Sequence, residues 1–240
     1  DELEDKLKKY SPKLIYTIPN FQNPTGRTAS LERRRKYLEL AEKYNAVIVE
    51  DDPYGLLRYE GEAVPSIKSL DETGRVIYVT SFSKVISPGL RVGAAVAAPT
   101  VLRKMIIGKQ ATDVHTNSLS QAIVDRFLRQ GYMPEQLKKS NKIHGERKNK
   151  MQEMLDKYFP KDVKYTRPDG GLFIWAELKE GINTLDVLQK TTQRDVAFIP
   201  GSHFFAEGDG LNTMRLNFSN SSFERIEKGI KILAETISEF

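Results

Sequence analysis

The amino-acid sequence predicts an α/β protein, in which a mainly parallel sheet is followed by a small α+β domain. Two observations predict this class. In the first half of the chain, short apolar and β-branched runs alternate with longer amphipathic runs, as in a sheet that is covered by helices. After Pro160, short strand-like runs surround turns and two helical segments. We place the boundary near residue 145, so that the predicted domains are residues 1–145 and 146–240.

Four runs in the first half are predicted strands. They are largely continuous apolar runs, which is typical of parallel strands that are buried on both faces. The chain begins with a charged, helix-like segment, and Ser30 is the expected N-cap of a helix between the first two strands. The predicted strands are residues 13–18, 46–50, 75–80 and 91–98.

From about Thr100 the pattern becomes helical and then turns to α+β. Three helices are predicted, and the last is long enough to connect two domains. Two strands are then expected around the turn Pro168–Gly171, followed by a short helix, two more strands and a final helix. The predicted helices are residues 101–113, 118–131, 134–159, 184–192 and 222–240, and the later strands lie in residues 196–200 and 213–219.

Composition excludes several classes of protein. The chain has 240 residues, of which 39% are hydrophobic and 29% charged, as in a soluble globular protein with a core. No apolar run approaches the ~20 residues of a membrane span, and we expect no secretory signal. Cysteine is absent, which excludes disulfides and thiolate metal sites and predicts a cytoplasmic protein. The net charge of +5 is scattered among glutamates, which predicts a solvated surface rather than a nucleic-acid site.

Polar loops follow three of the predicted parallel strands. The first carries Asn-Pro-Thr-Gly at residues 23–26, the second carries Asp51–Tyr54, and the third carries Ser81–Lys84, with Arg91 just beyond. The carboxyl ends of parallel strands are where functional residues gather. Each loop alone is ordinary turn or surface sequence, but their shared position indicates a site.

The third loop has the chemistry of an amine beside a phosphate site. A lysine amine can form a Schiff base with a carbonyl. Burial and a nearby cation, for which Arg91 is the candidate, lower the pKa of such an amine and make it nucleophilic. Arginine and small hydroxyls also suit a phosphate monoester. Lys84 with Ser81, Ser83 and Arg91 therefore suggests an aldehyde that carries a phosphate.

The other two loops suit an aromatic ring. Asp51 ends a predicted buried strand, where a carboxylate needs a partner, and a protonated pyridine nitrogen would be one. The Tyr54 phenol and the Asn23 amide can contact an aromatic oxygen.

With these motifs in this order, the chain resembles the class I/II aminotransferases of fold type I, which use pyridoxal 5'-phosphate. The resemblance is carried by "NPTG", "DDPY", "SFSK" with "PGLR", and a late "RLNFS". The branch that includes 2-aminoadipate and kynurenine aminotransferases is similar in "IPNFQNPTG", "EDDPYG" and "SFSKVISPGLRVG". The resemblance covers essentially the whole chain. It implies that residues 1–145 are the C-terminal portion of the cofactor-binding large domain and that residues 146–240 are the small domain.

The resemblance implies a role for each matching residue. Lys84 would be the catalytic residue that holds the cofactor as a Schiff base. Arg215 would bind the substrate α-carboxylate with help from Asn23, although by itself it would be read as a surface arginine. Asp51 would pair with the ring nitrogen, and the phenol and amide would contact the 3-oxygen. The implied cofactor-binding residues are Asn23, Asp51, Tyr54, Ser81, Ser83, Lys84 and Arg91.

The implied function is transfer of an amino group between an amino acid and a 2-oxo acid by a ping-pong mechanism, in a homodimer with no membrane contact. The alternative is the effector-sensing domain of a winged-helix transcription regulator, which has this fold behind a DNA-binding domain. Nucleic acid would be a partner only in that case. A lyase or decarboxylase on the same fold is a third interpretation, because fold does not fix the reaction.

Family members have more chain before the first of these strands, so we expect this sequence to be a fragment or to lack a front part. The isolated chain is then expected to expose an unpaired sheet edge and apolar strand faces, and to aggregate or bind cofactor poorly. Two further expectations concern single residues. Trp175 is expected in the core, and the histidines, which are His115, His144 and His203, have no metal-ligand spacing.

Overall fold

The computed structural model describes residues 2–240, which form two compact units. The first unit contains the residues up to Asn20, Thr28–Leu57 and Gly61–Lys138. The second unit contains Phe21–Arg27, Arg58–Glu60 and Lys139–Phe240. Each unit is described by itself below. The predicted domain boundary near residue 145 stays a prediction.

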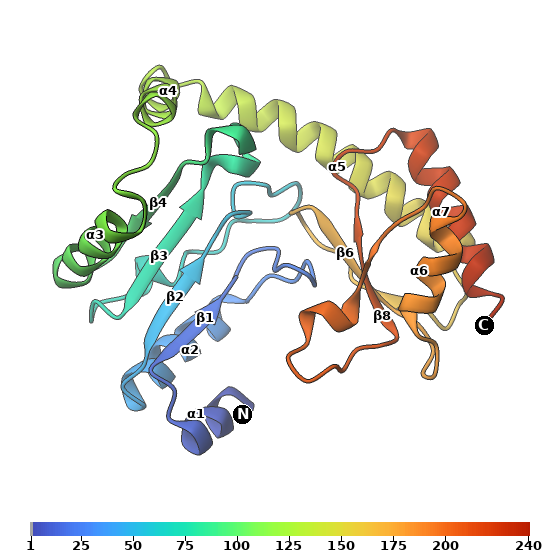
Figure 1. Cartoon of the computed structure of the whole chain (residues 1–240), viewed down its shortest axis with the longest axis horizontal. Coiled ribbons are helices and arrows are strands. Elements are labelled where there is room, and N and C mark those ends of the chain that lie inside the picture. The colour runs from blue at the N-terminus through green and yellow to red at the C-terminus, as the bar shows by residue number, and fades with distance from the viewer. Residues whose placement is uncertain (1) are drawn as a thin grey trace. The chain divides into compact units, whose positions relative to one another are not determined.

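The first unit is built on a four-stranded sheet in the order β1-β2-β3-β4 (Figure 1). β1, β2 and β3 are parallel, and β4 is antiparallel to β3. The prediction of an α/β fold with a mainly parallel sheet is therefore confirmed, and each predicted strand is present. The strands are Leu14–Thr17, Val47–Asp51, Val76–Ser81 and Gly93–Val96.

One face of this sheet is covered by helices α1 (Glu2–Tyr10) and α2 (Leu31–Lys43). As predicted, Ser30 caps α2, and its side chain accepts a hydrogen bond from the Arg33 amide. The buried cluster on this face includes Leu7, Ile15, Leu40, Ile48 and Val76.

The opposite face of the sheet is not covered in the same way. Leu14 and Tyr16 of β1 point away from the buried cluster and are 51% and 58% exposed. Within residues 2–240, the expectation that helices cover both faces is therefore wrong, whereas the expectation that the chain exposes apolar faces of its strands agrees with these exposures. Period-2 alternation within β1 places its apolar residues on two faces, of which the described helices bury only one.

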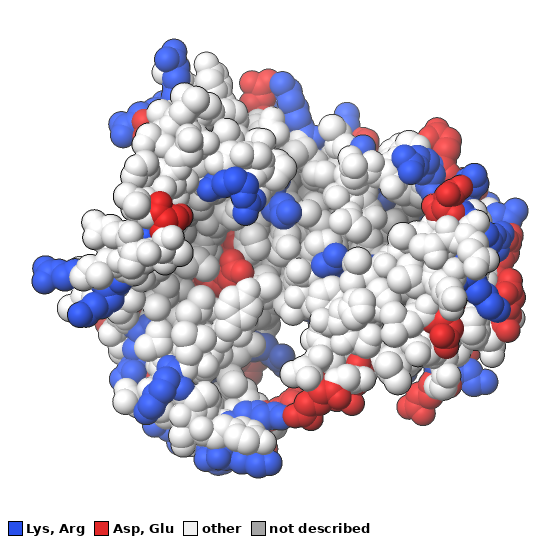
Figure 2. All heavy atoms as spheres, in the orientation of Figure 1, with Lys and Arg blue, Asp and Glu red and all other residues white. Residues whose placement is uncertain are grey.

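Three helices follow β4, as predicted. They are α3 (Pro99–Asp113), α4 (Ser118–Arg129) and α5 (Met133–Tyr158). Within residues 2–240, none of the helices is both long and apolar enough to cross a membrane. Figure 2 shows that Lys and Arg lie among Asp and Glu on the visible face, without forming one continuous basic surface.

The second unit has its own antiparallel sheet, in the order β5-β6-β8-β7, and this confirms the predicted α+β unit. One face of the sheet, with Ile174, Ala176, Met214 and Leu216, joins the core formed with α5, α6 and α7. The predicted strand at residues 196–200 is shorter than expected. The elements are β5 (Lys164–Tyr165), β6 (Phe173–Glu177), α6 (Thr184–Thr192), β7 (Ile199–Pro200), β8 (Thr213–Asn217) and α7 (Phe223–Ile237).

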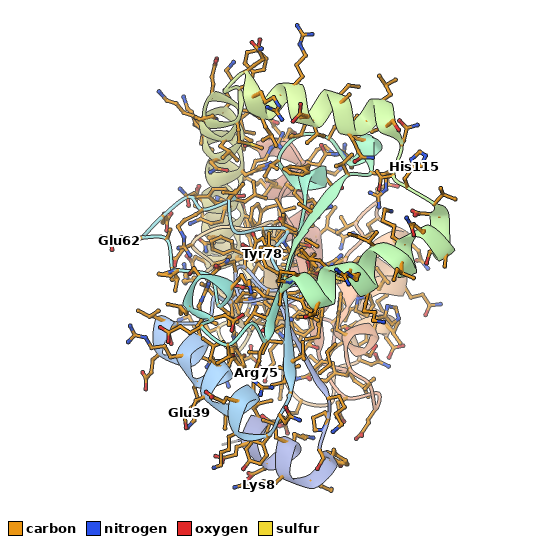
Figure 3. All side chains as sticks on the ribbon, turned by 90° about the vertical axis from the view of Figure 1, so that its left-hand side faces the viewer. Lys8, Glu39, Glu62, Arg75, Tyr78 and His115 are labelled. Carbon is orange, nitrogen blue, oxygen red and sulfur yellow. The ribbon has the colours of Figure 1, made fainter. Side chains whose placement is uncertain are left out.

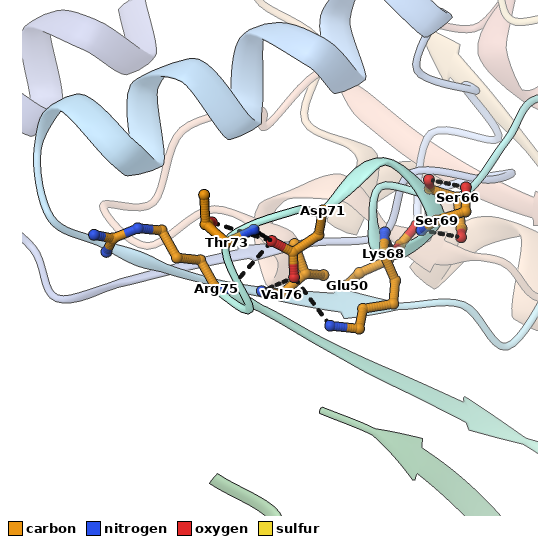
Figure 4. A network of polar contacts seen from close by, with 8 residues as sticks. All are labelled: Glu50, Ser66, Lys68, Ser69, Asp71, Thr73, Arg75 and Val76. Carbon is orange, nitrogen blue, oxygen red and sulfur yellow. Dashed lines mark hydrogen bonds and ion pairs between the residues drawn. The ribbon is translucent and has the colours of Figure 1, made fainter. Parts of the chain in front are cut away.

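Two buried carboxylates fix the connection between β2 and β3 (Figure 4). Glu50 accepts hydrogen bonds from the Ile67 and Lys68 amides at 2.9 and 2.7 Å. Asp71 accepts from the amides of Arg75 and Val76 and from the Lys68 amine. Burial opposes ionisation of Asp71, but these donors lower its pKa to about 2. The network holds the start of β3 and therefore sets where its carboxyl end lies.

Candidate functional site

The adjacent acids at the end of β2 have different partners. Asp51 is the last residue of the strand and is half-buried, and its Oδ2 accepts a hydrogen bond from the Tyr16 hydroxyl at 2.6 Å. Asp52 accepts from the Asn20 side-chain amide at 3.0 Å and from the Tyr78 hydroxyl at 3.2 Å. Tyr78 lies on β3, in the middle of the sheet (Figure 3). Asp52 is thus tied into local structure.

Asp52 also shapes the turn that follows. Its Oδ1 accepts a hydrogen bond from the Gly55 amide at 2.9 Å, which closes the turn around Tyr54. A Cβ on Gly55 would lie 2.5 Å from Asp52 Oδ2, so a side chain there would have to displace this carboxylate. Tyr54 itself is buried, with 6% exposure. The predicted site residue Tyr54 therefore sits in a fixed turn two residues beyond Asp52.

Arg34 supports this turn from α2. The arginine is fully buried, and its NH2 group donates to Asn20 Oδ1, while the Asn20 amide donates to Asp52. The sequence analysis did not identify Arg34, because it is the middle of three consecutive arginines and only helical phase distinguishes it. Burial against the β1 exit makes it a supporting residue of the site.

The strand register places the predicted residues of β2 and β3 on one face. Asp51 pairs with Val79, and Ser81 follows Val79 by two positions, so the side chains of Asp51 and Ser81 point to the same face. Tyr16 pairs with Val49 and points to this face as well. It is the face that α1 and α2 leave open.

Ser81, Ser83 and Arg91 lie together at the end of β3. Ser81 Oγ accepts from the Ser83 amide at 3.1 Å, and Arg91 NH1 donates to Ser83 Oγ at 3.4 Å. The antiparallel pairing of Ser81 with Gly93 brings Arg91 back beside the loop. Arg91 has a φ of 55°, a left-handed conformation that aims the chain into β4. A guanidinium beside two hydroxyls is a donor set for an anion.

Lys84 ends the short 3-10 turn Phe82–Lys84 that follows β3. Its side chain is exposed. The burial that we expected around this amine is therefore wrong for residues 2–240, because the turn projects beyond the end of the sheet and the described helices do not cover it. The amine remains close in the chain to the hydroxyls and to the cation, as predicted.

In the second unit, Asn23 lies in a closed turn. Gln22 closes this turn with two hydrogen bonds. Its backbone amide donates to the Arg27 carbonyl, and its side-chain Oε1 accepts from the Thr25 amide at 2.9 Å. Gly26 has a φ of +69°, and a Cβ there would lie 2.6 Å from the Phe173 carbonyl oxygen. The turn therefore presents the Asn23 side chain from a backbone that tolerates little change.

Arg215 binds Asn23 directly. Its NH1 group donates to Asn23 Oδ1 at 2.6 Å. The guanidinium lies over the rings of Phe173 and Phe204, at 4.2 and 5.2 Å from their centroids. A planar fork held in this way suits a bound carboxylate.

Trp175 is buried, with 9% exposure, as expected for a core residue. It pairs across the sheet with Arg215, so both side chains stand on the same face. Its ring is 5.9 Å from Phe204 and 6.5 Å from Phe205. The expectation that Trp175 is buried in the core is confirmed, and its neighbours there include the aromatic rings beside Arg215.

The three histidines lie on different elements, and His203 is exposed on the 3-10 turn Gly201–Phe204, next to Phe204. His115 is exposed on the segment between α3 and α4 (Figure 3). His144 is half-buried near the Tyr59 ring, where burial and the nearby Arg147 lower its pKa. Among residues 2–240, no cluster of three or more His, Asp or Glu side chains could hold a metal ion.

Comparison with known proteins identifies the family of this chain. The family model for "Aminotransferase class I and II" matches residues 1–233. An aromatic-amino-acid aminotransferase of Thermococcus litoralis is 47% identical over 244 residues, which is 100% of this chain and 58% of that protein. A transcriptional regulator of the helix-turn-helix type from Bacillus subtilis, YisV, is 34% identical over 95% of this chain and 47% of its own length.

Solved structures agree with this. The crystal structure of Pyrococcus horikoshii kynurenine aminotransferase, in complex with PMP, matches with a TM-score of 0.97 and 44% identity. The α-aminoadipate aminotransferase LysN of Thermus thermophilus, complexed with N-(5'-phosphopyridoxyl)-L-leucine, matches with a TM-score of 0.95 and 40% identity. This chain is covered to 99% and 100%, and those chains to 60% and 62%. The chain thus spans about 60% of their length, has their fold, and belongs to the class I and II aminotransferase family.

Proposed function

We propose that the protein is an aminotransferase that uses pyridoxal 5'-phosphate to move an amino group between an amino acid and a 2-oxo acid. One observation carries the proposal. A carboxylate, an amine, two hydroxyls and a guanidinium follow the ends of two neighbouring parallel strands, at Asp51 and at Ser81–Arg91. Each of these groups matches one part of that cofactor.

The donor set of the first unit fits the cofactor. Arg91 and the hydroxyls of Ser81 and Ser83 provide a cation and short donors for the phosphate. The half-buried Asp51 carboxylate is a partner for a protonated ring nitrogen. The buried Tyr54 phenol, and Asn23 in the second unit, are the proposed partners of the 3-oxygen.

Lys84 is the proposed catalytic residue. When bound, pyridoxal phosphate supplies an electron sink that stabilises negative charge at the substrate α-carbon. The Lys84 amine would hold the cofactor at its carbonyl carbon and, when not bound to it, would accept and return the proton at the substrate α-carbon. Asp51 would pair with the protonated ring nitrogen.

For the second unit, we propose that Arg215 binds the substrate α-carboxylate and that Asn23 assists. The guanidinium is positioned by Asn23 Oδ1 at 2.6 Å and by the rings of Phe173 and Phe204. These contacts fix the plane of the fork, and a fixed fork matches a carboxylate in a bidentate way. The role accounts for recognition of amino acids as a class rather than of one side chain.

The experiment is an amine-donor screen on the full-length protein in rapid-mixing spectroscopy. Aromatic amino acids, kynurenine and 2-aminoadipate are the first donors, because related proteins carry these substrates in their names. The proposal predicts loss of the cofactor aldehyde absorbance on mixing with a donor and its return on adding a 2-oxo acid. A protein that binds the cofactor but never converts it with any donor would contradict the proposal.

The regulator alternative has one specific observation in its favour, which is the 34% identity with YisV. It predicts that amino acids change the binding of the full-length protein to promoter DNA without turnover. Gel-shift measurements with and without amino acid, next to the donor screen, distinguish the two functions.

We also propose a homodimer in the cytoplasm. Apolar side chains of α3 and α4 are unusually exposed in the described chain, at 58% for Ile106, 54% for Ile107 and 71% for Leu119. Such residues on adjacent helices indicate a surface that is covered by another chain. Sedimentation of the full-length protein tests this, and a monomer at micromolar concentration would contradict it.

A further inference from the structure

The hydroxyl of Tyr16 connects β1 to the carboxylate at the end of β2. Tyr16 lies in the middle of β1, and its hydroxyl donates a 2.6 Å hydrogen bond to Oδ2 of Asp51, which is 35 residues further along the chain. Because Tyr16 pairs with Val49, both Tyr16 and Asp51 stand on the open face of the sheet. The rigid pairing of β1 with β2 therefore delivers the phenol to the carboxylate.

The contact determines which oxygen of Asp51 is presented to a ligand. An O–H···O⁻ bond of this length is of the short, charge-assisted kind. With Oδ2 engaged by Tyr16, the side chain is held in one rotamer and Oδ1 is the oxygen left toward a ligand. Without the phenol, the Asp51 carboxylate loses this restraint on its rotation. Asp52, on the opposite face of β2, is held by other partners.

The phenol is suited to remain a donor. Partial burial, followed by the hydrogen bond and the charge of Asp51, raises the pKa of Tyr16 to about 12, and the Tyr54 phenol contributes to the rise. Tyr16 therefore stays protonated at any pH at which an enzyme of this kind would work. Tyr16 as a residue is 58% exposed, so its side chain adds little to the core.

We propose that Tyr16 is a positioning residue that acts through Asp51, holding the carboxylate in the orientation that receives the protonated ring nitrogen of the cofactor. The inference rests on the proposed function. It assigns to the hydroxyl of Tyr16, rather than to its ring, an effect on cofactor binding that disappears when the ligand has no ring nitrogen.

The experiment titrates two ligands into the cofactor-free full-length protein. One is pyridoxal phosphate, and the other is the analogue in which a C–H group replaces the ring nitrogen. The variant is Tyr16→Phe, and the matched control is Tyr10→Phe, which removes the hydroxyl of a tyrosine that is 61% exposed on α1. We expect Tyr16→Phe to weaken binding of pyridoxal phosphate about tenfold and to leave binding of the analogue unchanged.

The controls separate positioning from structure. Tyr10→Phe should leave the affinity for both ligands unchanged, and in an Asp51→Asn background Tyr16→Phe should have no further effect. Equal affinity of wild type and Tyr16→Phe for pyridoxal phosphate would overturn the inference. So would an equal loss for both ligands, which would mark a structural role. Failure of the wild type to bind pyridoxal phosphate would overturn the proposed function itself, and the inference with it.

Discussion

Replacing Arg34 by methionine should destabilise the protein severely. The guanidinium is completely buried and donates five hydrogen bonds. Methionine keeps the aliphatic volume but removes every donor. The acceptors left behind are the main-chain oxygens of Pro19, Ala29, Val64 and Pro65 and Oδ1 of Asn20.

The size of the effect depends on how many of these acceptors are buried, because a buried acceptor cannot bind water in place of the lost donor. The bonds to Pro19 and Asn20 are fully buried, and the other three are partly buried. The Pro19 oxygen keeps the Ala29 amide as a donor, so Asn20 Oδ1 is the fully buried acceptor that loses its partner, at a cost of about 1–3 kcal/mol. The three partly buried acceptors add to this cost. The sum is a large part of the ~5–15 kcal/mol by which a domain is stable.

Urea unfolding followed by circular dichroism measures this loss. Arg35→Met is the matched control, because Arg35 is the next residue of the same helix and is exposed. It should change the free energy of unfolding by no more than about 0.5 kcal/mol. If Arg34→Met were no worse than Arg35→Met, the buried hydrogen bonds would not be what holds the β1 exit, and our account of the Asp52 turn would be refuted.

Three further predictions concern other parts of the chain. Asp71 has a pKa of about 2 in the folded protein, against an ordinary 3.8. It therefore contributes about 2 kcal/mol to the free energy of unfolding above pH 4, and this contribution is lost as the pH falls toward 2. Asp71→Asn should make the free energy of unfolding less dependent on pH in this range, and an unchanged dependence would contradict the prediction. Gly26→Ala should cost ~1–2 kcal/mol for the left-handed backbone and about 1–3 kcal/mol more for the clash with the Phe173 carbonyl. Gly181→Ala, at a φ of +92° in open space, should cost only the backbone term. Equal shifts of the melting temperature would show that the clash is relieved. Arg215→Lys should raise the KM for amino acids at least tenfold, because an ammonium cannot replace the fork, and steady-state kinetics that show an unchanged KM would remove Arg215 from substrate binding.

The sequence predicted the elements well where the pattern was strongly periodic or bounded by caps. The parallel strands and the helix capped by Ser30 are where the alternation and the cap place them. It predicted the wrong environment for the strands, because a continuous apolar run does not reveal whether helices from the same chain cover both faces. Tyr16 shows this: the run Lys13–Ile18 reads as buried, yet its phenol is half in solvent and bonded to Asp51.

The supporting residues of the site could not be predicted, because each depends on a long-range contact. Arg34 differs from Arg33 and Arg35 only by its phase on α2, and that phase matters only once the β1 exit lies beside it. The burial of Trp175 was predicted, but its place beside Arg215 was not. The cross-strand pairing with Arg215, which decides its face, links residues far apart in the sequence.

The most direct test of the central claim is chemical labelling of Lys84. Borohydride reduction of the full-length protein with bound pyridoxal phosphate, followed by peptide mapping, should place a pyridoxyl group on the peptide that contains Lys84 and on no other. Lys84→Ala should remove both the label and transamination, while its circular dichroism stays that of the wild type. A label on another lysine, or a Lys84→Ala protein that still transaminates, would contradict the account.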